Sequence, residues 1–307
     1  MSSKLRLGFV GLGMMGHPMV RHLAAKGFAP TVYDIDSAAM TRLAGIEGVH
    51  PAASLADLAA KSDVVITMLP DGRVVRRVAL GDPQGSNDHL LAGLGAGAVI
   101  VDMSSSDPFG TRDLGADLAR YNIRLLDAPV SGGVKGAEAA TLAIMAGGDA
   151  ATLDRCRDVL LAMGKAVHHA GPLGAGHAAK ALNNYVSAAG LLAAVEAVIA
   201  GQRFGLDPAG LIDIINASTG RNNSTESKVR QQILSRDFAG GFALSLMAKD
   251  LRTALGLARQ SGLKLPLAEA CVAVWNQADD ALEPGVDHTA IARLLEGING
   301  EVLRQLT

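Results

Sequence analysis

Short apolar runs rich in branched residues recur along the first half of the chain, separated by stretches with helical spacing. The runs occupy residues 5–10, 30–34, 63–69, 98–103, 123–129 and 141–147. The intervening stretches, for instance Met15–Lys26 and Pro108–Arg120, are rich in alanine and leucine. Alternating strands and helices predict a parallel sheet, and runs that are apolar throughout predict strands buried on both faces. We therefore expect a doubly wound α/β domain over residues 1–172.

The pattern changes after about residue 170. A glycine-rich segment at 171–176 leads into a long Ala/Leu-rich helix, which we expect at about 176–204 and which ends near Gly205. Further segments with helical spacing follow, without convincing strands. The sequence therefore predicts an all-helical second domain over 173–307, with the long helix passing from one domain to the other.

Composition restricts the possible functions. Of the 307 residues, 49% are hydrophobic and 19% charged, which is typical of a globular protein. A net charge of −2 and 3% aromatic residues do not favour nucleic acid as a partner. Cys156 and Cys271 form no C-x-x-C pair, and the eight histidines show no H-x-x-x-H or H-E-x-x-H spacing. We expect no metal.

The apolar start of the chain differs from a signal peptide. Lys4 and Arg6 precede a run of about eight apolar residues that glycines interrupt. The most apolar later stretch, Val186–Ala200, is shorter than the ~20 residues that span a bilayer and contains Glu196. We expect a soluble, cytoplasmic protein with no membrane partner.

The segment GLGMMG has the G-x-G-x-x-G spacing of a dinucleotide-binding loop. It follows a predicted strand and opens a predicted helix, which is the context that the motif requires. Gly11 permits the tight turn, Gly13 lets the pyrophosphate approach the backbone, and Gly16 lets the helix pack on the strand. We therefore expect a Rossmann-type domain whose cofactor contacts include Gly11, Leu12, Gly13, Met14, Met15 and Gly16.

Asp34 ends the second predicted strand, where an acidic side chain can accept a hydrogen bond from the ribose 2′-hydroxyl. Asp36 follows it closely, and the nearest downstream arginine is Arg42. Two carboxylates would repel a 2′-phosphate, so the sequence favours NAD over NADP. The alternative is that Asp34 only caps the following helix.

Two further segments carry groups suited to a small acid. The segment at 127–133, DAPVSGG, closes a strand with a serine hydroxyl and glycine N–H groups that could hold a carboxylate. Lys180 and Asn184 are four residues apart, so their side chains share one helix face. That face is otherwise alanine-rich, and Lys180 is either a surface residue or a deliberately buried amine.

Six motifs occur in one order along the chain: GLGMMGHPM, ITMLP, VDMSSSDP, DAPVSGG, GAGHAAKALNN and LMAKDL. Together they resemble the 3-hydroxyisobutyrate dehydrogenase, or β-hydroxyacid dehydrogenase, family, from about residue 5 to the C-terminus. The resemblance implies a Rossmann-type domain, an all-helical domain and an active site in the cleft between them. It also implies hydride transfer between NAD and the 3-hydroxyl carbon of a small β-hydroxy acid, and a homodimer or homotetramer.

Matched position by position, the resemblance implies that Lys180 is the general acid/base and that Asn184 helps to hold the substrate. The substrate carboxylate would bind to Ser131, Gly132 and Gly133. Further cofactor contacts would be Leu69, Pro70, Ser105, Phe242 and Lys249. Ser104-Ser105 stands where the family usually has Ser-Thr, which keeps the hydroxyl.

Alternatives remain for the substrate and for the reaction. The family carries an aromatic residue where this chain has Asn223, and an amide suits a substrate with extra hydroxyls or a second polar group, such as tartronate semialdehyde or a serine-like acid. In 6-phosphogluconate dehydrogenases, which decarboxylate, the lysine motif continues with His-Asn rather than Leu182-Asn183-Asn184. A non-catalytic dinucleotide-binding module or an imine reductase would lack Lys180.

Overall fold

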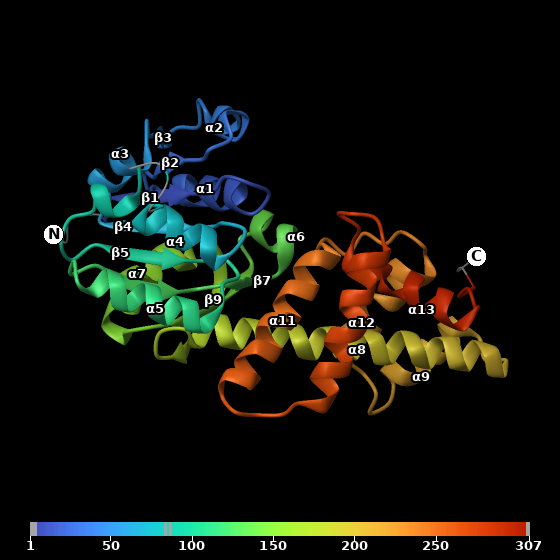
Figure 1. Ribbon diagram of the computed structural model, residues 1–307. Coiled ribbons are helices and arrows are strands. Elements are labelled where there is room, and N and C mark those ends of the chain that lie inside the picture. The colour runs from blue at the N-terminus through green and yellow to red at the C-terminus, as the bar shows by residue number, and fades with distance from the viewer. Residues whose placement is uncertain (1–4, 83–84, 86–87, 305–307) are drawn as a thin grey trace. The chain divides into compact units, whose positions relative to one another are not determined.

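The computed structural model describes residues 5–82, 85 and 88–304 and divides into two compact units (Figure 1). Unit 1 extends to Lys180 and unit 2 begins at Ala181. The division falls inside helix α8 (Ala175–Phe204), which contributes to both units. The predicted domain limits, 1–172 and 173–307, stay a prediction.

Unit 1 contains a nine-stranded sheet in the order β3-β2-β1-β4-β5-β6-β8-β7, with β9 paired to β8. All six predicted strands are confirmed: β1 (Leu7–Val10), β2 (Thr31–Tyr33), β4 (Val64–Thr67), β5 (Val99–Asp102), β6 (Arg124–Asp127) and β8 (Leu142–Gly147). The remaining strands are β3 (His50–Pro51), β7 (Val130–Ser131) and β9 (Gly164–Gly171).

The strands β1 to β6 pair in parallel, but β8 runs antiparallel to β6 and β7. The expectation of a parallel sheet therefore holds for most of the sheet and is wrong at β8. An apolar run has the same pattern in either direction, so the sequence predicts the strand without its direction.

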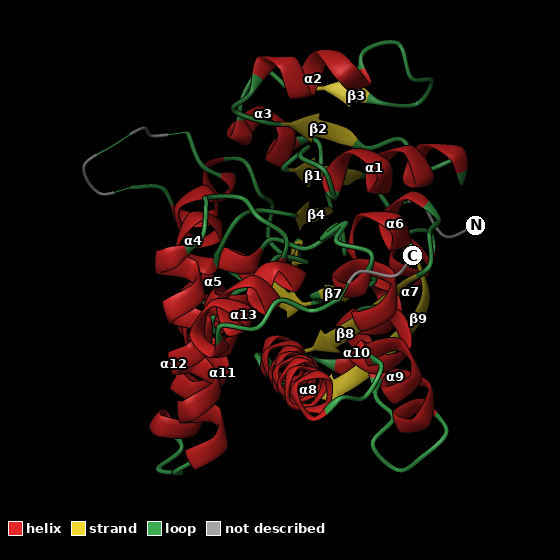
Figure 2. Cartoon of the chain, turned by 90° about the vertical axis from the view of Figure 1, so that its right-hand side faces the viewer, coloured by secondary structure: helices red, strands yellow, loops and turns green. Residues whose placement is uncertain are grey.

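Both faces of the sheet are covered, because neighbouring residues of one strand belong to different cores. Phe9 and Ile66 pack into one hydrophobic cluster, whereas Val10 and Val65 pack into another. Successive side chains of a strand point to opposite faces, so the clusters lie on opposite sides of the sheet. Figure 2 shows helices on both sides. They are α1 (Gly16–Ala25), α2 (Ser37–Leu43), α6 (Gly133–Glu138) and α7 (Ala150–Leu161) on one side, and α3 (Leu55–Ala60), α4 (Gly72–Leu80) and α5 (Pro108–Ala119) on the other.

The strand order reverses direction at β1, which lies between β2 and β4. In open α/β sheets the crevice outside the carboxyl ends of such strands is where ligands bind. Gly11 follows β1 with a φ of +99°, and a Cβ at this position would lie 2.2 Å from the Met68 carbonyl oxygen after β4. The loops after β1 and β4 therefore meet in direct backbone contact, which only glycine permits.

Unit 2 is helical, as predicted, and among its described residues the β-type pairing is one isolated bridge, between Ala243 and Asp287. Its core surrounds the fully buried Trp275. Its helices beyond α8 are α9 (Pro208–Asn216), α10 (Asn223–Ser227), the π-helical turn η2 (Val229–Leu234), α11 (Leu244–Gln260), α12 (Pro266–Ala281), the 3-10 turn η3 (His288–Ala290) and α13 (Ile291–Asn299).

Helix α8 has 30 residues, close to the predicted length. By length and composition alone it could cross a membrane, since its most apolar window of 18 residues has a mean hydropathy of 1.4. The core helix of a soluble protein passes the same test, and Leu191, Val195 and Val198 of α8 are fully buried in the core of unit 2. The short apolar stretch read from sequence is therefore part of a longer helix.

Candidate active site

The glycine loop at 11–16 joins β1 to α1 at the switch point of the sheet. A Cβ on Gly16 would lie 1.9 Å from the Gly11 carbonyl oxygen, so the helix can approach the loop only with glycine there. Gly13 differs, because a Cβ on it would meet no atom within 4 Å. Its backbone is exposed and open to a ligand, which is the geometry that a pyrophosphate site needs.

Asp34 is held against this loop by both carboxylate oxygens. Oδ2 accepts the Leu12 N–H at 2.6 Å, and Oδ1 accepts the Asp36 N–H at 2.8 Å. The cap of α2 is Asp36, whose side chain accepts the Ala38 N–H, so the alternative reading of Asp34 as a helix cap is wrong. Each oxygen of Asp34 retains a lone pair that could accept from a ribose hydroxyl.

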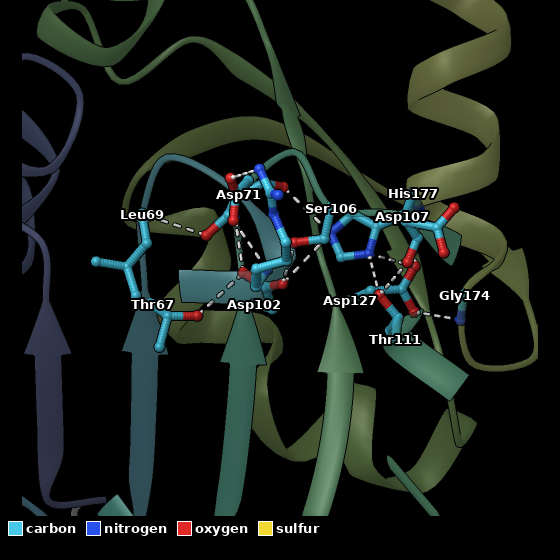
Figure 3. Close-up of polar contacts among 12 residues, drawn as sticks. Thr67, Leu69, Asp71, Asp102, Ser106, Asp107, Thr111, Asp127, Gly174 and His177 are labelled. Carbon is cyan, nitrogen blue, oxygen red and sulfur yellow. Dashed lines mark hydrogen bonds and ion pairs between the residues drawn. The ribbon is translucent and has the colours of Figure 1, made fainter. Parts of the chain in front are cut away.

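The loops after β4 and β5 are tied together around a buried carboxylate (Figure 3). Leu69 donates its N–H to the Ser104 hydroxyl at 2.9 Å. Asp102, only 2% exposed, accepts from the Thr67 hydroxyl at 3.0 Å, the Ser104 N–H at 3.0 Å and the Ser106 hydroxyl at 2.7 Å. These bonds anchor the residues on each side of Ser105, the predicted ribose contact.

Helix α8 begins beside a second buried carboxylate, also drawn in Figure 3. Asp127, fully buried at the end of β6, accepts the N–H of Gly174 at 2.8 Å and that of His177 at 2.7 Å. A carboxylate at a helix start satisfies N–H groups that have no partner within the helix and complements its dipole. A Cβ on Gly176 would lie 2.2 Å from the Met145 carbonyl oxygen, so the turn is also sterically fixed. The position of Lys180 in unit 1 follows from this anchor.

The ring of His177 extends the anchor to the loop after β5. Its Nδ1 lies 2.8 Å from the Thr111 hydroxyl, and its Nε2 lies 3.1 Å from the Ser104 carbonyl oxygen. A carbonyl can only accept, so Nε2 is the donor. The buried ring also lies 3.7 Å from Asp102 and 3.8 Å from Asp127. His177 therefore connects α8 with the loop that carries Ser105.

The predicted carboxylate loop starts from the same strand end. Ser131 is half-buried in β7 and follows Asp127 by four residues in the chain. Gly132 and Gly133 adopt φ values of +131° and +60°, which side chains with a Cβ rarely adopt. The structure thus places Ser131 and the start of α8 on one support.

In unit 2, Asn184 is buried and its Nδ2 donates to Asp250 Oδ2 at 2.6 Å. Because a carboxylate can only accept, this bond fixes the orientation of the amide. Lys249 Nζ lies 3.8 Å from Asp250 Oδ1. The structure therefore brings Asn184 and Lys249 together around Asp250, a residue that sequence reasoning did not select.

Phe242 is anchored separately within unit 2. Its ring packs edge-to-face on His288 with the centroids 6.1 Å apart, and its backbone N–H donates to Asp287 at 3.0 Å. Its predicted place beside the nicotinamide stays a prediction.

Asp102, Asp127 and His177 are not among the site residues that the sequence predicts. The available signal was weak: an aspartate ends each of two neighbouring strands, and a histidine follows the glycines that open a helix. The bonds themselves join residues that are far apart in the chain.

The described ranges contain no group of three or more His, Cys, Asp and Glu side chains arranged to hold a metal ion. Cys156 and Cys271 are buried, and desolvation raises the pKa of each thiol to about 11. Such thiols are poor nucleophiles at neutral pH.

Two family models together cover nearly all of the chain. The NAD binding domain of 6-phosphogluconate dehydrogenase matches residues 6–171. The model for NAD-binding of NADP-dependent 3-hydroxyisobutyrate dehydrogenase matches residues 174–295.

Individual relatives match over the same length. The 2-(hydroxymethyl)glutarate dehydrogenase of Eubacterium barkeri is 36% identical, with 98% of each chain covered. The 3-hydroxyisobutyrate dehydrogenase of Pseudomonas aeruginosa is 37% identical, over 95% of this chain and 98% of its own. A solved structure of Mycobacterium tuberculosis 3-hydroxyisobutyrate dehydrogenase with L-serine has a TM-score of 0.86 at 35% identity, covering 95% of this chain and 99% of that chain.

Changing Asp127 to asparagine should destabilise the protein. The substitution keeps the shape but replaces one acceptor oxygen by an N–H donor, so one N–H at the start of α8 loses its acceptor. We expect the free energy of unfolding to fall by about 1–3 kcal/mol, measured by urea denaturation. The matched control is Asp154→Asn, at a carboxylate that is 68% exposed. Equal stability of the two variants would contradict the anchoring role.

NAD should bind more tightly than NADP, because the Asp34 carboxylate crowds and repels a 2′-phosphate. Titration of both cofactors should show a preference of at least about tenfold, and Asp34→Asn should narrow it by removing the charge. Asp36→Asn, which removes the charge that caps α2, should narrow the preference less. Equal affinity of the wild type for both cofactors would sink this interpretation.

Proposed function

Because the chain belongs to the 3-hydroxyisobutyrate dehydrogenase, or β-hydroxyacid dehydrogenase, family, we propose that it oxidises the hydroxymethyl group of a small 2-substituted 3-hydroxypropanoate. The chain is an NAD-dependent oxidoreductase. The rest of the proposal is supported mainly by the position of Lys180 on α8. It lies one helical turn after His177, whose backbone and ring are both hydrogen-bonded, and one turn before Asn184.

The compounds named for the relatives support this substrate class. 3-Hydroxyisobutyrate, L-serine and 2-(hydroxymethyl)glutarate each carry a hydroxymethyl group on the carbon that bears a carboxylate. They differ only in the remaining substituent, which is a methyl, an ammonium or a carboxyethyl group. The site would therefore recognise the hydroxymethyl group and the carboxylate that these compounds share.

The oxidation removes a hydride and a proton from one CH–OH unit, leaving a semialdehyde. NAD, when bound, accepts the hydride. Lys180 takes the hydroxyl proton and returns it in the reductive direction. A lysine acts as a base only when neutral, and burial together with a nearby positive charge favours the neutral amine.

The other groups position the substrate. The Ser131 hydroxyl and the N–H groups of Gly132 and Gly133 bind the carboxylate, which fixes the reacting carbon. Asn184, oriented by Asp250, donates or accepts at the substrate oxygen. Correct placement of reacting groups is itself a large part of a rate enhancement.

We assign the cofactor to the residues around the switch point of the sheet. The open backbone at Gly13 and the anchored Asp34 carboxylate support this assignment in unit 1. The remaining contacts that we propose are Gly11, Leu12, Met14, Met15, Gly16, Leu69, Pro70 and Ser105 in unit 1, and Phe242 and Lys249 in unit 2.

Lys180→Ala should lose nearly all turnover while NAD affinity barely changes, because the acid/base would be gone and the nucleotide contacts intact. We expect kcat to fall by roughly 10²–10⁴-fold, followed as absorbance of reduced cofactor. Lys180→Arg should fail nearly as badly, since a guanidinium stays charged near neutral pH. Asn184→Ala should mainly raise KM.

The matched control for Lys180 is Lys165→Ala, at an exposed lysine on β9 of the same unit, which should keep wild-type kcat. The assignment is wrong if folded Lys180→Ala binds NAD and keeps about a tenth or more of the wild-type kcat.

We also propose a homodimer or homotetramer in a cytoplasmic location. Val186 on α8 is 69% exposed and Phe204, its last residue, is 86% exposed. Exposed apolar side chains along one helix are consistent with a surface that a second copy covers. Light scattering should give two or four times the 31.5 kDa of one chain. A mass near 31.5 kDa at micromolar concentration would rule out the assembly.

A further inference from the structure

One stripe of α8 changes from polar to apolar along its length. Positions that follow each other at intervals of three and four residues share a helix face. From Lys180 the stripe continues through Asn184 and Ser187, and then through residues that are fully buried in the core of unit 2: Leu191, Val195 and Val198. Ser187 is therefore the last polar position before the core.

A second lysine reaches this last polar position from another element. Lys228, between α10 and η2, donates from Nζ to the Ser187 hydroxyl at 3.1 Å. Burial lowers the pKa of Lys228, which the more distant charge of Asp287 only partly offsets. Over the described part of the chain, no carboxylate oxygen lies within 4.0 Å of this ammonium.

That situation differs from Arg236, a cation of unit 2 whose side chain is 26% exposed. Arg236 forms two hydrogen bonds to the Glu296 carboxylate. A desolvated ammonium with only a hydroxyl partner is costly for the fold. An anion bound beside Lys228 would remove that cost.

The backbone around Lys228 is held firmly over α8. Asn222 and Thr225 form a capping box, and the Lys228 N–H donates to the Ser224 carbonyl at 3.0 Å. A Cβ on Gly190 would lie 3.4 Å from Asn222 Oδ1, so the loop lies directly on the helix. The amine is thus presented to the polar half of the stripe by a preformed turn.

We propose that Lys228, supported by Ser187, binds a second anionic group on the 2-substituent, and that the preferred substrates are 2-substituted 3-hydroxypropanoates with a second carboxylate. This inference rests on the proposed function. Ser187 lies two helical turns beyond Lys180, about 10 Å along the axis. A substituent of two or more carbons would direct its carboxylate along this stripe, away from the hydroxyl that reacts.

The test compares two substrates that share the reacting unit, 2-(hydroxymethyl)glutarate and 3-hydroxyisobutyrate, each with NAD. The wild type should prefer the dicarboxylate by at least about tenfold in kcat/KM. Lys228→Met keeps the length of the side chain and removes its charge. It should lower kcat/KM for the dicarboxylate by about 10- to 100-fold, through KM, and leave 3-hydroxyisobutyrate within about threefold.

Two variants serve as controls. Lys228→Arg keeps a cation and should retain most of the preference, whereas Lys264→Met, at an exposed lysine of unit 2, should match the wild type. Thermal unfolding checks that Lys228→Met is folded. If Lys228→Met does not fold, Lys228→Gln replaces it, and the preference of the wild type between the two substrates is the second readout.

The outcomes separate this inference from the proposed function. Equal loss on both substrates in Lys228→Met would mean a structural role, and an unchanged dicarboxylate KM would mean no contact; either result overturns the inference alone. A wild type that oxidises 3-hydroxyisobutyrate without preferring the dicarboxylate also overturns it alone. A wild type that reduces NAD with neither substrate, nor with L-serine, overturns the proposed function itself.

Discussion

The candidate site depends on one buried carboxylate at the start of helix α8. Asp127 is fully buried and accepts N–H groups of Gly174 and His177. An ionised group is costly in the interior unless donors surround it, so the helix start and the end of β6 stabilise each other. Because Ser131 follows Asp127 closely in the chain, the same anchor positions the loop that we predict to bind the substrate carboxylate. The contact between Asp127 and His177, about one helical turn before Lys180, would therefore set the position of the Lys180 side chain.

His177 joins this anchor to the loop after β5. Its ring occupies the space between Asp127 and Asp102, and it donates to the carbonyl of Ser104, which precedes the predicted ribose contact Ser105. Asp102 ends β5 and Asp127 ends β6, and the imidazole of His177 lies within 4 Å of both carboxylates. A hydride transfer requires substrate and nicotinamide to be held within a fraction of an ångström of one another. A shared polar network in the interior provides that rigidity for the residues of unit 1.

The sequence predicts those features that depend on neighbouring residues. Apolar runs located six strands, and the glycine spacing located the loop whose packing at Gly16 leaves no room for a Cβ. It could not predict the direction of β8, because direction depends on pairing with distant strands. The sequence left open whether Asp34 contacts the ribose or only caps the following helix, and in the structure the cap of α2 is Asp36. The hydrogen-bond partners of Asn184 and His177 could not be predicted for the same reason, because they lie far away in the sequence.

In the proposed mechanism, the stripe on α8 separates the residue that transfers the proton from the residues that select the substrate. Lys180 stands at its beginning, where unit 1 fixes the helix, whereas Ser187 stands at its end, where α10 and η2 bring in Lys228. A side chain that binds only the substituent can change without disturbing the acid/base. Burial of Lys228 with a hydroxyl rather than a carboxylate as its partner also costs stability that an apolar residue of similar length would avoid. A cost of this kind, on the same helix face as Lys180, is better explained by ligand binding than by folding.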